Sequence, residues 1–144
     1  MPTNRYQDHL EDEILTADPV HLIQLLYRGA LDSITSARRY LKLGDIRARS
    51  RAISKAMAIV TELSLSLNHP AGGDVSKNLD ELYGYSQKLL IQANAEQSDP
   101  PLAEVERLLS TLMEAWQSEK LTGKSGTGTA QTISSTPVGV APGR

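Results

Sequence analysis

Apolar side chains recur every three or four residues along four long stretches of the chain, which short polar breaks separate. This spacing places the apolar positions on one side of an α-helix, the side that packs against a core. We therefore expect helices over residues 19–43, 46–67, 75–97 and 100–119. Four helices with one apolar stripe each and short connections predict an all-α fold, an antiparallel up-down four-helix bundle.

Residues that favour helix starts mark the expected boundaries. Asp18 and Asp99 each precede a proline, and an aspartate cap followed by proline at the first helical position is a favoured start. A glycine ends the first helix, and Asp45 directly after it is the expected cap of the second. The segment 68–73 contains a proline and two glycines, so it predicts a break, after which Asp74 caps the third helix.

The apolar stripes predict which residues form the core. The second helix contributes Ile46, Ile53, Met57, Val60, Leu63 and Leu67. The third contributes Val75, Leu79, Leu82, Ser86, Leu89 and Ala93, and the fourth Leu102, Val105, Leu109, Leu112 and Trp116. Because the chain has no phenylalanine and one tryptophan, the core must consist mainly of aliphatic side chains.

The first expected helix carries more apolar surface than one core requires. One stripe consists of Ile23, Leu26, Tyr27, Ala30, Ile34, Ala37 and Leu41, and beside it lie Leu22, Leu25, Gly29, Ser33 and Tyr40. Together they cover an arc of roughly 200°. Either this helix is central and contacts others on two sides, or a mobile segment or a partner covers part of it. Gly29 is expected to permit the close approach of another helix.

The first 17 residues are expected to form a separate N-terminal segment. Tyr6, Leu10 and Ile14 are spaced by four residues, as in a short amphipathic helix that docks weakly and is displaceable. A frayed terminus is the alternative. The last segment, residues 120–144, is rich in Gly, Ser, Thr and Pro without a period, which predicts a flexible, disordered tail. The bundle itself then occupies residues 18–119.

The net charge of −2 gives no general attraction to nucleic acid or anionic lipid. Seven basic residues nevertheless cluster in one stretch: Arg38, Arg39, Lys42, Arg47, Arg49, Arg51 and Lys55. We interpret them as a solvated charged face and expect no nucleic-acid partner. The acidic N-terminus lacks the apolar core of a signal peptide, and no stretch reaches membrane-spanning length. We therefore expect a cytoplasmic protein without direct membrane insertion.

No pattern of catalytic or cofactor-binding residues stands out. Cysteine is absent, which excludes disulfides, zinc thiolates and thiol catalysis. The string Gly123-Lys124-Ser125 resembles the end of a phosphate-binding loop, but Ser118 stands where that motif requires a glycine. Bundles that hold two metal ions need two Glu-x-x-His pairs, and the sequence has none. We expect no enzymatic activity, no catalytic residue, no metal and no cofactor.

Two segments carry a resemblance to a known family. Residues 15–30, LTADPVHLIQLLYRGA, combine a Thr-Ala-Asp-Pro start with Leu-Tyr-x-Gly-Ala. Residues 72–85, GGDVSKNLDELYGY, combine Gly-Gly, Asn-Leu and Leu-Tyr-x-Tyr, and Ala93-Asn94 follow. In this order the motifs resemble the FliS family of flagellar secretion chaperones, and the similarity covers about residues 6–119. The long C-terminal tail departs from the family pattern.

The resemblance implies a four-helix bundle that binds the disordered C-terminal region of flagellin, prevents premature polymerisation and presents the complex to a component of the flagellar export gate. The residues that we expect to bind flagellin are Tyr6, Leu10, Ile14, Tyr27, Asn78, Leu82, Tyr83 and Tyr85. We expect a monomer or a weak homodimer. The alternative is a self-associating structural or regulatory bundle without a client.

Overall fold

Four long helices make up the part of the chain that the computed structural model describes, residues 18–122. They are α2 (Pro19–Leu43), α3 (Ile46–Leu65), α4 (His69–Glu96) and α5 (Asp99–Thr122). The expected N-terminal segment and residues 123–144 lie outside the described residues. The last helix continues to Thr122, three residues into the segment that we predicted as tail.

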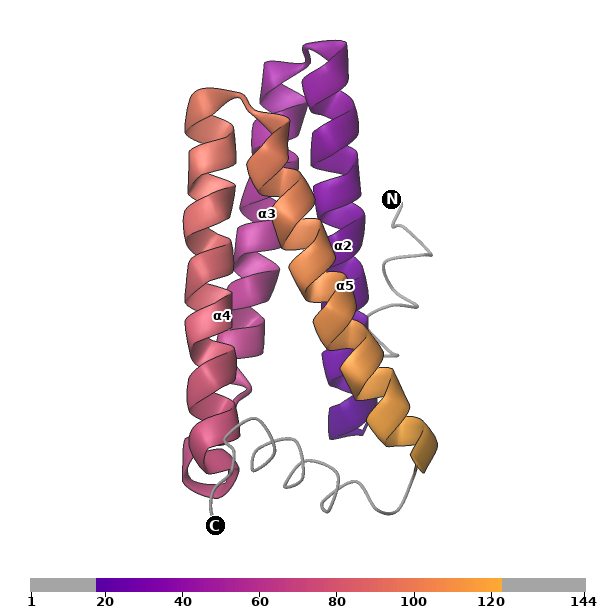
Figure 1. Ribbon diagram of the computed structural model, residues 1–144. Coiled ribbons are helices and arrows are strands. Elements are labelled where there is room, and N and C mark those ends of the chain that lie inside the picture. Colours follow the sequence, from indigo (N-terminus) through magenta and orange to yellow (C-terminus); the bar gives the residue numbers. More distant parts are fainter. Residues whose placement is uncertain (1–17, 123–144) are drawn as a thin grey trace, which may run out of the picture.

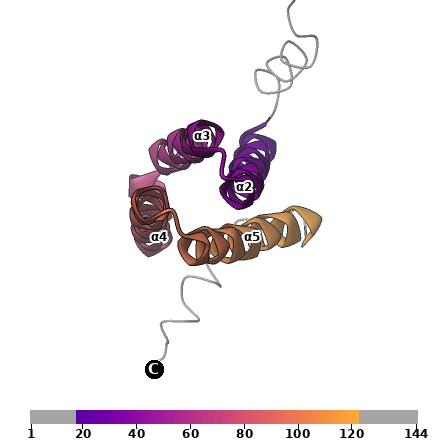
Figure 2. The same ribbon diagram turned by 90° about the horizontal axis from the view of Figure 1, so that it is seen from above.

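The helices alternate in direction and form an antiparallel bundle (Figure 1). Each helix packs against two others: α2 contacts α3 and α5, and α4 contacts α3 and α5. Figure 2 shows the four helices around a common core, with α5 inclined to the rest. The predicted up-down four-helix bundle is confirmed. Because α2 has a neighbour on each side, two packing contacts use much of its wide apolar arc.

Aspartate side chains start the first two helices as predicted. The Asp18 carboxylate accepts a hydrogen bond of 2.8 Å from the backbone N–H of His21, and Asp45 accepts one of 3.1 Å from that of Ala48. Gly44 follows α2 with a φ of 75°, in the left-handed region that glycine favours. The two caps give partners to N–H groups that a helix start otherwise leaves unpaired.

The start of α4 differs from the prediction. Asn68, not Asp74, caps the helix, since its side-chain oxygen accepts a hydrogen bond of 3.3 Å from the backbone N–H of Ala71. The helix begins at His69 and kinks at Gly73, whose φ of 53° and ψ of −128° favour glycine. The predicted break in segment 68–73 is therefore present as a kink at Gly73, directly before Asp74, within a helix that begins at His69.

Asp99 also has a different role from the predicted cap. It is the first residue of α5, and its two carboxylate oxygens accept hydrogen bonds of 2.8 and 2.9 Å from the guanidinium of Arg38 on α2. The same guanidinium pairs with Glu106, further along α5. The bonds from Arg38 lower the pKa of the Asp99 carboxyl below its ordinary value. Arg38 is therefore part of an ion pair that joins α2 to α5.

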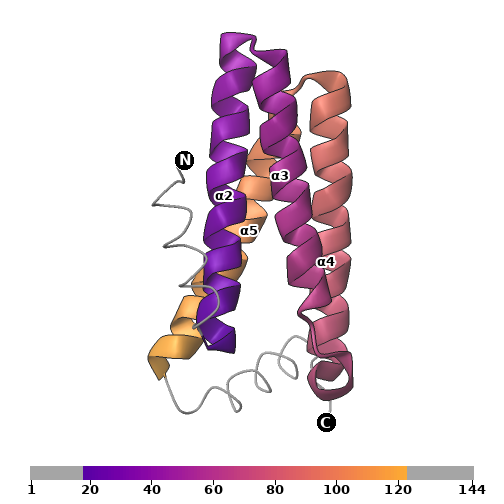
Figure 3. The same ribbon diagram turned by 180° about the vertical axis from the view of Figure 1, so that it is seen from behind.

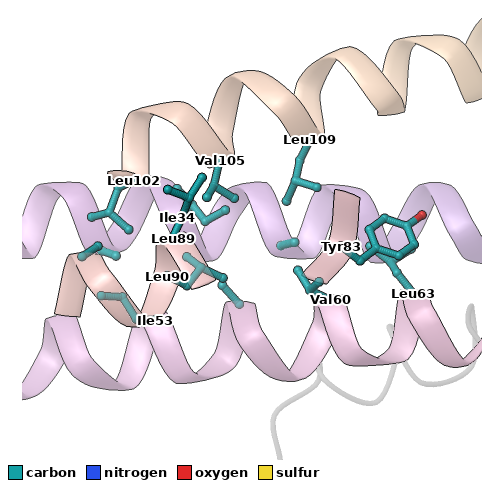
Figure 4. Close-up of a cluster of buried hydrophobic side chains, with 14 of the residues drawn as sticks. Ile34, Ile53, Val60, Leu63, Tyr83, Leu89, Leu90, Leu102, Val105 and Leu109 are labelled. Carbon is teal, nitrogen blue, oxygen red and sulfur yellow. The ribbon is translucent and has the colours of Figure 1, made fainter. Parts of the chain in front are cut away.

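Buried apolar side chains from all four helices form one core (Figure 4). The core prediction is wrong at Ile46, which is 56% exposed because it stands in the first turn of α3, next to the turn from α2. On α4 the buried side chains include Tyr83 and Leu90, which the predicted stripe omitted. Three predicted core residues on α4 are only half-buried: Val75, Leu79 and Leu82. The buried side of α4 is rotated because Tyr83 points inward, where its hydroxyl has a hydrogen-bond partner.

Gly29 permits the close approach of α2 and α3, as the sequence predicts for a glycine within a helix. A Cβ atom at Gly29 would lie 3.3 Å from Cδ1 of Ile59 on α3, which is closer than most carbon contacts. Gly84 on α4 is the opposite case, since nothing lies within 4 Å of a Cβ placed there. The two helical glycines therefore differ in the room that their neighbours leave.

Gly29→Leu is expected to lower the free energy of unfolding by about 1–3 kcal/mol, because the added side chain overpacks the contact between α2 and α3. Gly84→Leu is the matched control. It is expected to raise the free energy of unfolding by about 0.5–1 kcal/mol, since leucine favours a helix more than glycine does. Urea unfolding followed by circular dichroism measures both values, and equal effects at the two positions would contradict the close approach.

Candidate functional site

One end of the bundle leaves apolar side chains partly uncovered. At the end where α2 begins and α5 finishes, six large apolar side chains of α2, α4 and α5 pack against the core but are only partly buried: Ile23, Leu26, Leu79, Leu112, Met113 and Trp116. We call these six residues the apolar end cluster. They come from α2, α4 and α5, so the cluster depends on how these three helices are arranged.

The inclination of α5 accounts for this partial exposure. Figures 1 and 3 show α5 leaving α4 and running along α2 towards the end where α2 begins. Leu102, Val105 and Leu109, in the first half of α5, have exposures of 0%. Leu112 and Trp116, in the second half, are only partly buried. The apolar stripe of α5 therefore continues past the region where all four helices enclose it.

Tyr27 on α2 and Tyr83 on α4 meet inside the bundle. Their hydroxyl oxygens are 2.6 Å apart and their ring centroids 6.4 Å apart. Both side chains are buried, with exposures of 0% and 1%, and the hydroxyl of Tyr27 also interacts with the side chain of Trp116 in the apolar end cluster. Because α2 and α4 stand diagonally across the bundle (Figure 2), the tyrosine pair joins two helices that are not neighbours.

Burial raises the pKa of both phenols above 10.0, and the proximity of Tyr27 raises the pKa of Tyr83 further. The folded protein therefore holds both phenols protonated. Their contribution to stability is complete below about pH 10, the pKa of an unfolded tyrosine, and is lost as the pH rises above it.

We accordingly expect the free energy of unfolding to fall as the pH rises above about 10, and to fall less steeply in Tyr83→Phe, which removes one of the two raised phenols. Urea unfolding at stepped alkaline pH measures both slopes. The wild-type protein and the variant would have the same slope if the pair did not titrate in this way.

Three predicted site residues share one side of α4. Asn78, Leu82 and Tyr85 are separated by four and three residues, so their side chains lie on the same face of the helix. Asn78 is exposed and Leu82 is half-buried. Tyr85 is 44% exposed, and its hydroxyl donates a hydrogen bond to Glu104 on α5. This face is accessible to a partner, whereas the buried tyrosine pair is not.

The remaining predicted site residues, Tyr6, Leu10 and Ile14, lie outside the part of the chain that the structure describes. The described chain begins at Asp18, at the same end of the bundle as the apolar end cluster. On α2 itself, Leu22 and Leu25 are half-buried. Part of the surplus apolar surface of α2 is therefore located in its first turns.

The apolar end cluster is not among the site residues that the sequence predicts. Met113 belongs to no predicted stripe, and Leu112 and Trp116 were assigned to a closed core. A periodic stripe shows which side of a helix is apolar, but not where a neighbouring helix diverges from it. The adjacent apolar residues at positions 112 and 113 were the available signal, since they widen the apolar face of α5 near its end.

A buried polar cluster between α3 and α4 was also missed. The guanidinium of Arg49 donates two hydrogen bonds of 3.2 Å to Oδ1 of Asn94, and the Ser50 hydroxyl donates a third of 3.0 Å. Arg49 is 4% exposed, so the interpretation of a solvated side chain is wrong for it. It turns inward because the last turns of α4 offer an acceptor, and a cation is favourable near a helix C-terminus.

Between residues 18 and 122, no helix is long and apolar enough to cross a membrane. Over the same residues, no group of three His, Asp or Glu side chains is arranged so that it could hold a metal ion. The apolar end cluster and the exposed face of α4 offer apolar contact area with nearby amide and hydroxyl groups.

The sequence matches known proteins along most of its length. A family model described as Flagellar protein FliS matches residues 2–121. A flagellar secretion chaperone FliS of Salmonella typhimurium is 38% identical over 77% of this chain and 83% of the relative. A flagellar secretion chaperone FliSB of Pseudomonas aeruginosa is 34% identical over 76% of this chain and 87% of the relative, and a FliS of Bacillus subtilis is 30% identical over 79% and 84%. The resemblance of the two motif segments is thus confirmed, and the chain belongs to the FliS family.

Proposed function

We propose that this protein is a cytoplasmic flagellar secretion chaperone that binds the disordered C-terminal region of flagellin and prevents its premature polymerisation. We further propose that it brings flagellin to a component of the flagellar export gate. Membership of a family whose curated members are named flagellar secretion chaperones supports the proposal. The observation that carries it is the apolar end cluster, a group of partly exposed apolar side chains in a chain of this family.

The apolar end cluster has the properties that an amphipathic client segment requires. Aliphatic, thioether and aromatic side chains of three helices are partly exposed at one end of the bundle, and a segment that folds against them removes apolar area from water at about 25 cal/mol per Å2. Met113 adapts to differently shaped side chains because its thioether chain is flexible. Ordering a disordered segment costs about 2–5 kcal/mol, so binding is reversible.

The predicted residues on α4 extend this contact surface. Leu82 adds apolar area, while Asn78 and Tyr85 offer an amide and a hydroxyl to the backbone of a client. Tyr27 and Tyr83 do not reach the surface. Their proposed role is to hold α2 and α4 in the arrangement that presents the cluster.

We assign to Tyr6, Leu10 and Ile14 the role of a cover for the apolar end cluster in the absence of a client. Ile14 precedes Asp18 by four residues, and α2 begins at the end that carries the cluster. An amphipathic segment attached there is within reach of the cluster. Because it contributes only three apolar side chains, a longer client displaces it.

Calorimetric titration of the full-length chain with a peptide of the flagellin C-terminal region tests the proposal. Met113→Asp places a charge in the apolar end cluster and is expected to weaken binding at least about 30-fold, or about 2 kcal/mol. Ile91→Asp is the matched control, at a position on α4 that is 55% exposed and outside the cluster. It is expected to bind like the wild-type protein, and thermal unfolding shows whether both variants fold.

The absence of both heat and a complex on gel filtration would reject the proposed function. Equal binding by Met113→Asp and the wild-type protein would instead place the client elsewhere on the bundle. The alternative, a self-associating bundle without a client, predicts a molar mass that rises with concentration in light scattering. A client chaperone is expected to be monomeric or weakly associated when alone.

A further inference from the structure

Charge is segregated between the two halves of the bundle. The neighbouring helices α2 and α3 hold eight basic and two acidic residues, whereas α4 and α5 hold four basic and nine acidic residues. The net charge of −2 over the whole chain conceals this difference. Seven of the eight basic residues lie between positions 38 and 55, around the turn that joins α2 to α3.

Most of these basic side chains are exposed. Arg38 is paired with two carboxylates of α5, and Arg49 is buried against Asn94. The other five are exposed: Arg39, Lys42, Arg47, Arg51 and Lys55. Asp45 is the one acidic residue between positions 38 and 55, and its carboxylate caps α3. The turn is therefore surrounded by an excess of exposed positive charge.

The same turn exposes two large aliphatic side chains. Leu43 is 71% exposed and Ile46 is 56% exposed, on either side of Gly44 and Asp45. Figures 1 and 3 show the turn projecting beyond the connection between α4 and α5. We call these two side chains and the five exposed basic residues the basic tip. Exposed aliphatic side chains surrounded by cations match a surface with an anionic outer layer and an apolar interior.

We propose that the basic tip docks on the surface of an anionic membrane. The cations lie against lipid phosphates, while Leu43 and Ile46 enter the boundary between the headgroups and the acyl chains. Each basic residue near an anionic surface contributes about fivefold in affinity, so the four nearest the turn, Arg39, Lys42, Arg47 and Arg51, contribute about 600-fold over a neutral surface. Lys55 stands about 14 Å further along α3 and contributes less. Docking is reversible and weakens with salt, because exposed charges are screened.

The position of the basic tip makes docking compatible with client binding. The tip is at the end of α2, while the cluster residues Ile23 and Leu26 are near its beginning, about 26–30 Å from Leu43 along the helix axis. The two surfaces therefore do not overlap. A docked protein holds the apolar end cluster away from the membrane, where a client reaches it.

Other anionic partners fit the basic tip less well. Binding to nucleic acid depends on hydrogen bonds to the bases and on stacking, and the aliphatic side chains of Leu43 and Ile46 provide neither. The acidic residues at positions 8 and 11–13 of the same chain precede Asp18 by ten residues or fewer, and ten extended residues span at most about 36 Å, which does not reach past the end of α2, about 37 Å away. A second copy offers acidic residues on α5, but Arg38 already holds two of them.

Sedimentation of the full-length protein with lipid vesicles tests the proposal. Vesicles of phosphatidylcholine are compared with vesicles of equal parts phosphatidylcholine and phosphatidylglycerol. The wild-type protein is expected to bind only the anionic vesicles and to dissociate as salt is added. Arg47→Gln/Arg51→Gln is expected to weaken binding about 25-fold, and Leu43→Ser/Ile46→Ser at least about tenfold.

Two matched controls separate the tip from general effects of charge and hydrophobicity. Lys77→Gln/Lys88→Gln removes two exposed cations from α4. Leu65→Ser removes a leucine that is 73% exposed at the other end of α3. Both variants are expected to bind anionic vesicles like the wild-type protein, and thermal unfolding confirms that every variant folds.

Several results would overturn the proposal. The proposal is wrong if the wild-type protein does not bind anionic vesicles or binds both kinds of vesicle equally. It is also wrong if both tip variants bind anionic vesicles as tightly as the wild-type protein. Binding of duplex DNA or polyglutamate without binding of vesicles would assign the tip to nucleic acid or to an acidic protein instead. No flagellin peptide is present in the experiment, so its outcome is independent of the proposed client.

Discussion

Tyr83→Ala is expected to lower the free energy of unfolding by about 3–5 kcal/mol, the usual cost of removing a large buried aromatic side chain. Tyr83 is 1% exposed, and its hydroxyl oxygen is 2.6 Å from that of Tyr27. Alanine at this position leaves a cavity between α2 and α4 and removes a hydrogen-bond partner from a buried hydroxyl. Urea unfolding at neutral pH, followed by circular dichroism, measures the loss.

Tyr83→Phe separates packing from hydrogen bonding. The ring remains in place, so the expected loss is only about 1 kcal/mol, the value of one buried hydrogen bond. Equal losses in Tyr83→Ala and Tyr83→Phe would show that the hydroxyl alone matters. A loss below about 1 kcal/mol in Tyr83→Ala would contradict the burial of this side chain.

Asn94→Leu is expected to lower the free energy of unfolding by about 2–3 kcal/mol. Oδ1 of Asn94 accepts hydrogen bonds from the guanidinium of Arg49 and from the hydroxyl of Ser50. Leucine fills a similar volume but accepts no hydrogen bond. The variant therefore leaves a cation that is 4% exposed without this acceptor, and the same urea titration measures the cost.

A second substitution shows whether Arg49 and Asn94 act as a pair. Arg49→Met in the Asn94→Leu background is expected to recover at least about 1 kcal/mol, because replacing both polar partners by apolar ones removes the unsatisfied charge. Asn94→Asp, which keeps an acceptor at this position, is the control and is expected to remain close to wild-type stability. Strictly additive losses for the two single substitutions would contradict the coupling.

The helix ends illustrate how far local sequence predicts this fold. Asp18, Gly44 and Asp45 act through bonds within one turn, so their roles are predictable from neighbouring residues alone. Asp99 has the same local pattern as Asp18, yet its carboxylate bonds to Arg38 on another helix. A cap can be predicted from a few residues, whereas a competing partner 61 positions away cannot.

The positions of α4 and Arg49 show a second limit. Hydrophobicity alone favours Val75, Leu79 and Leu82 as the buried side of α4, but Tyr83 is buried because its hydroxyl meets that of Tyr27. Arg49 resembles its exposed basic neighbours in sequence, and only the approach of α4 gives it an acceptor. In both cases a polar partner from a distant part of the chain decides which side chain is buried.

The candidate site was predictable in part. The surplus apolar surface of α2 and the accessible positions 78, 82 and 85 on α4 follow from helical spacing and from the family motifs. The contribution of Met113 and Trp116 did not follow, because it depends on the inclination of α5 away from α4 (Figure 1). A helix crossing angle results from the packing of whole faces, which a single apolar stripe does not specify.

Co-purification from the native cell tests the proposed chaperone role most directly. An affinity-tagged full-length chain is isolated from flagellated cells, and the retained proteins are identified by mass spectrometry. Flagellin is expected to be retained by the wild-type chain and by Ile91→Asp. The amount of retained flagellin is expected to be strongly reduced for Met113→Asp. Recovery of the folded wild-type chain without flagellin, from cells that make flagellin, would contradict the proposed function.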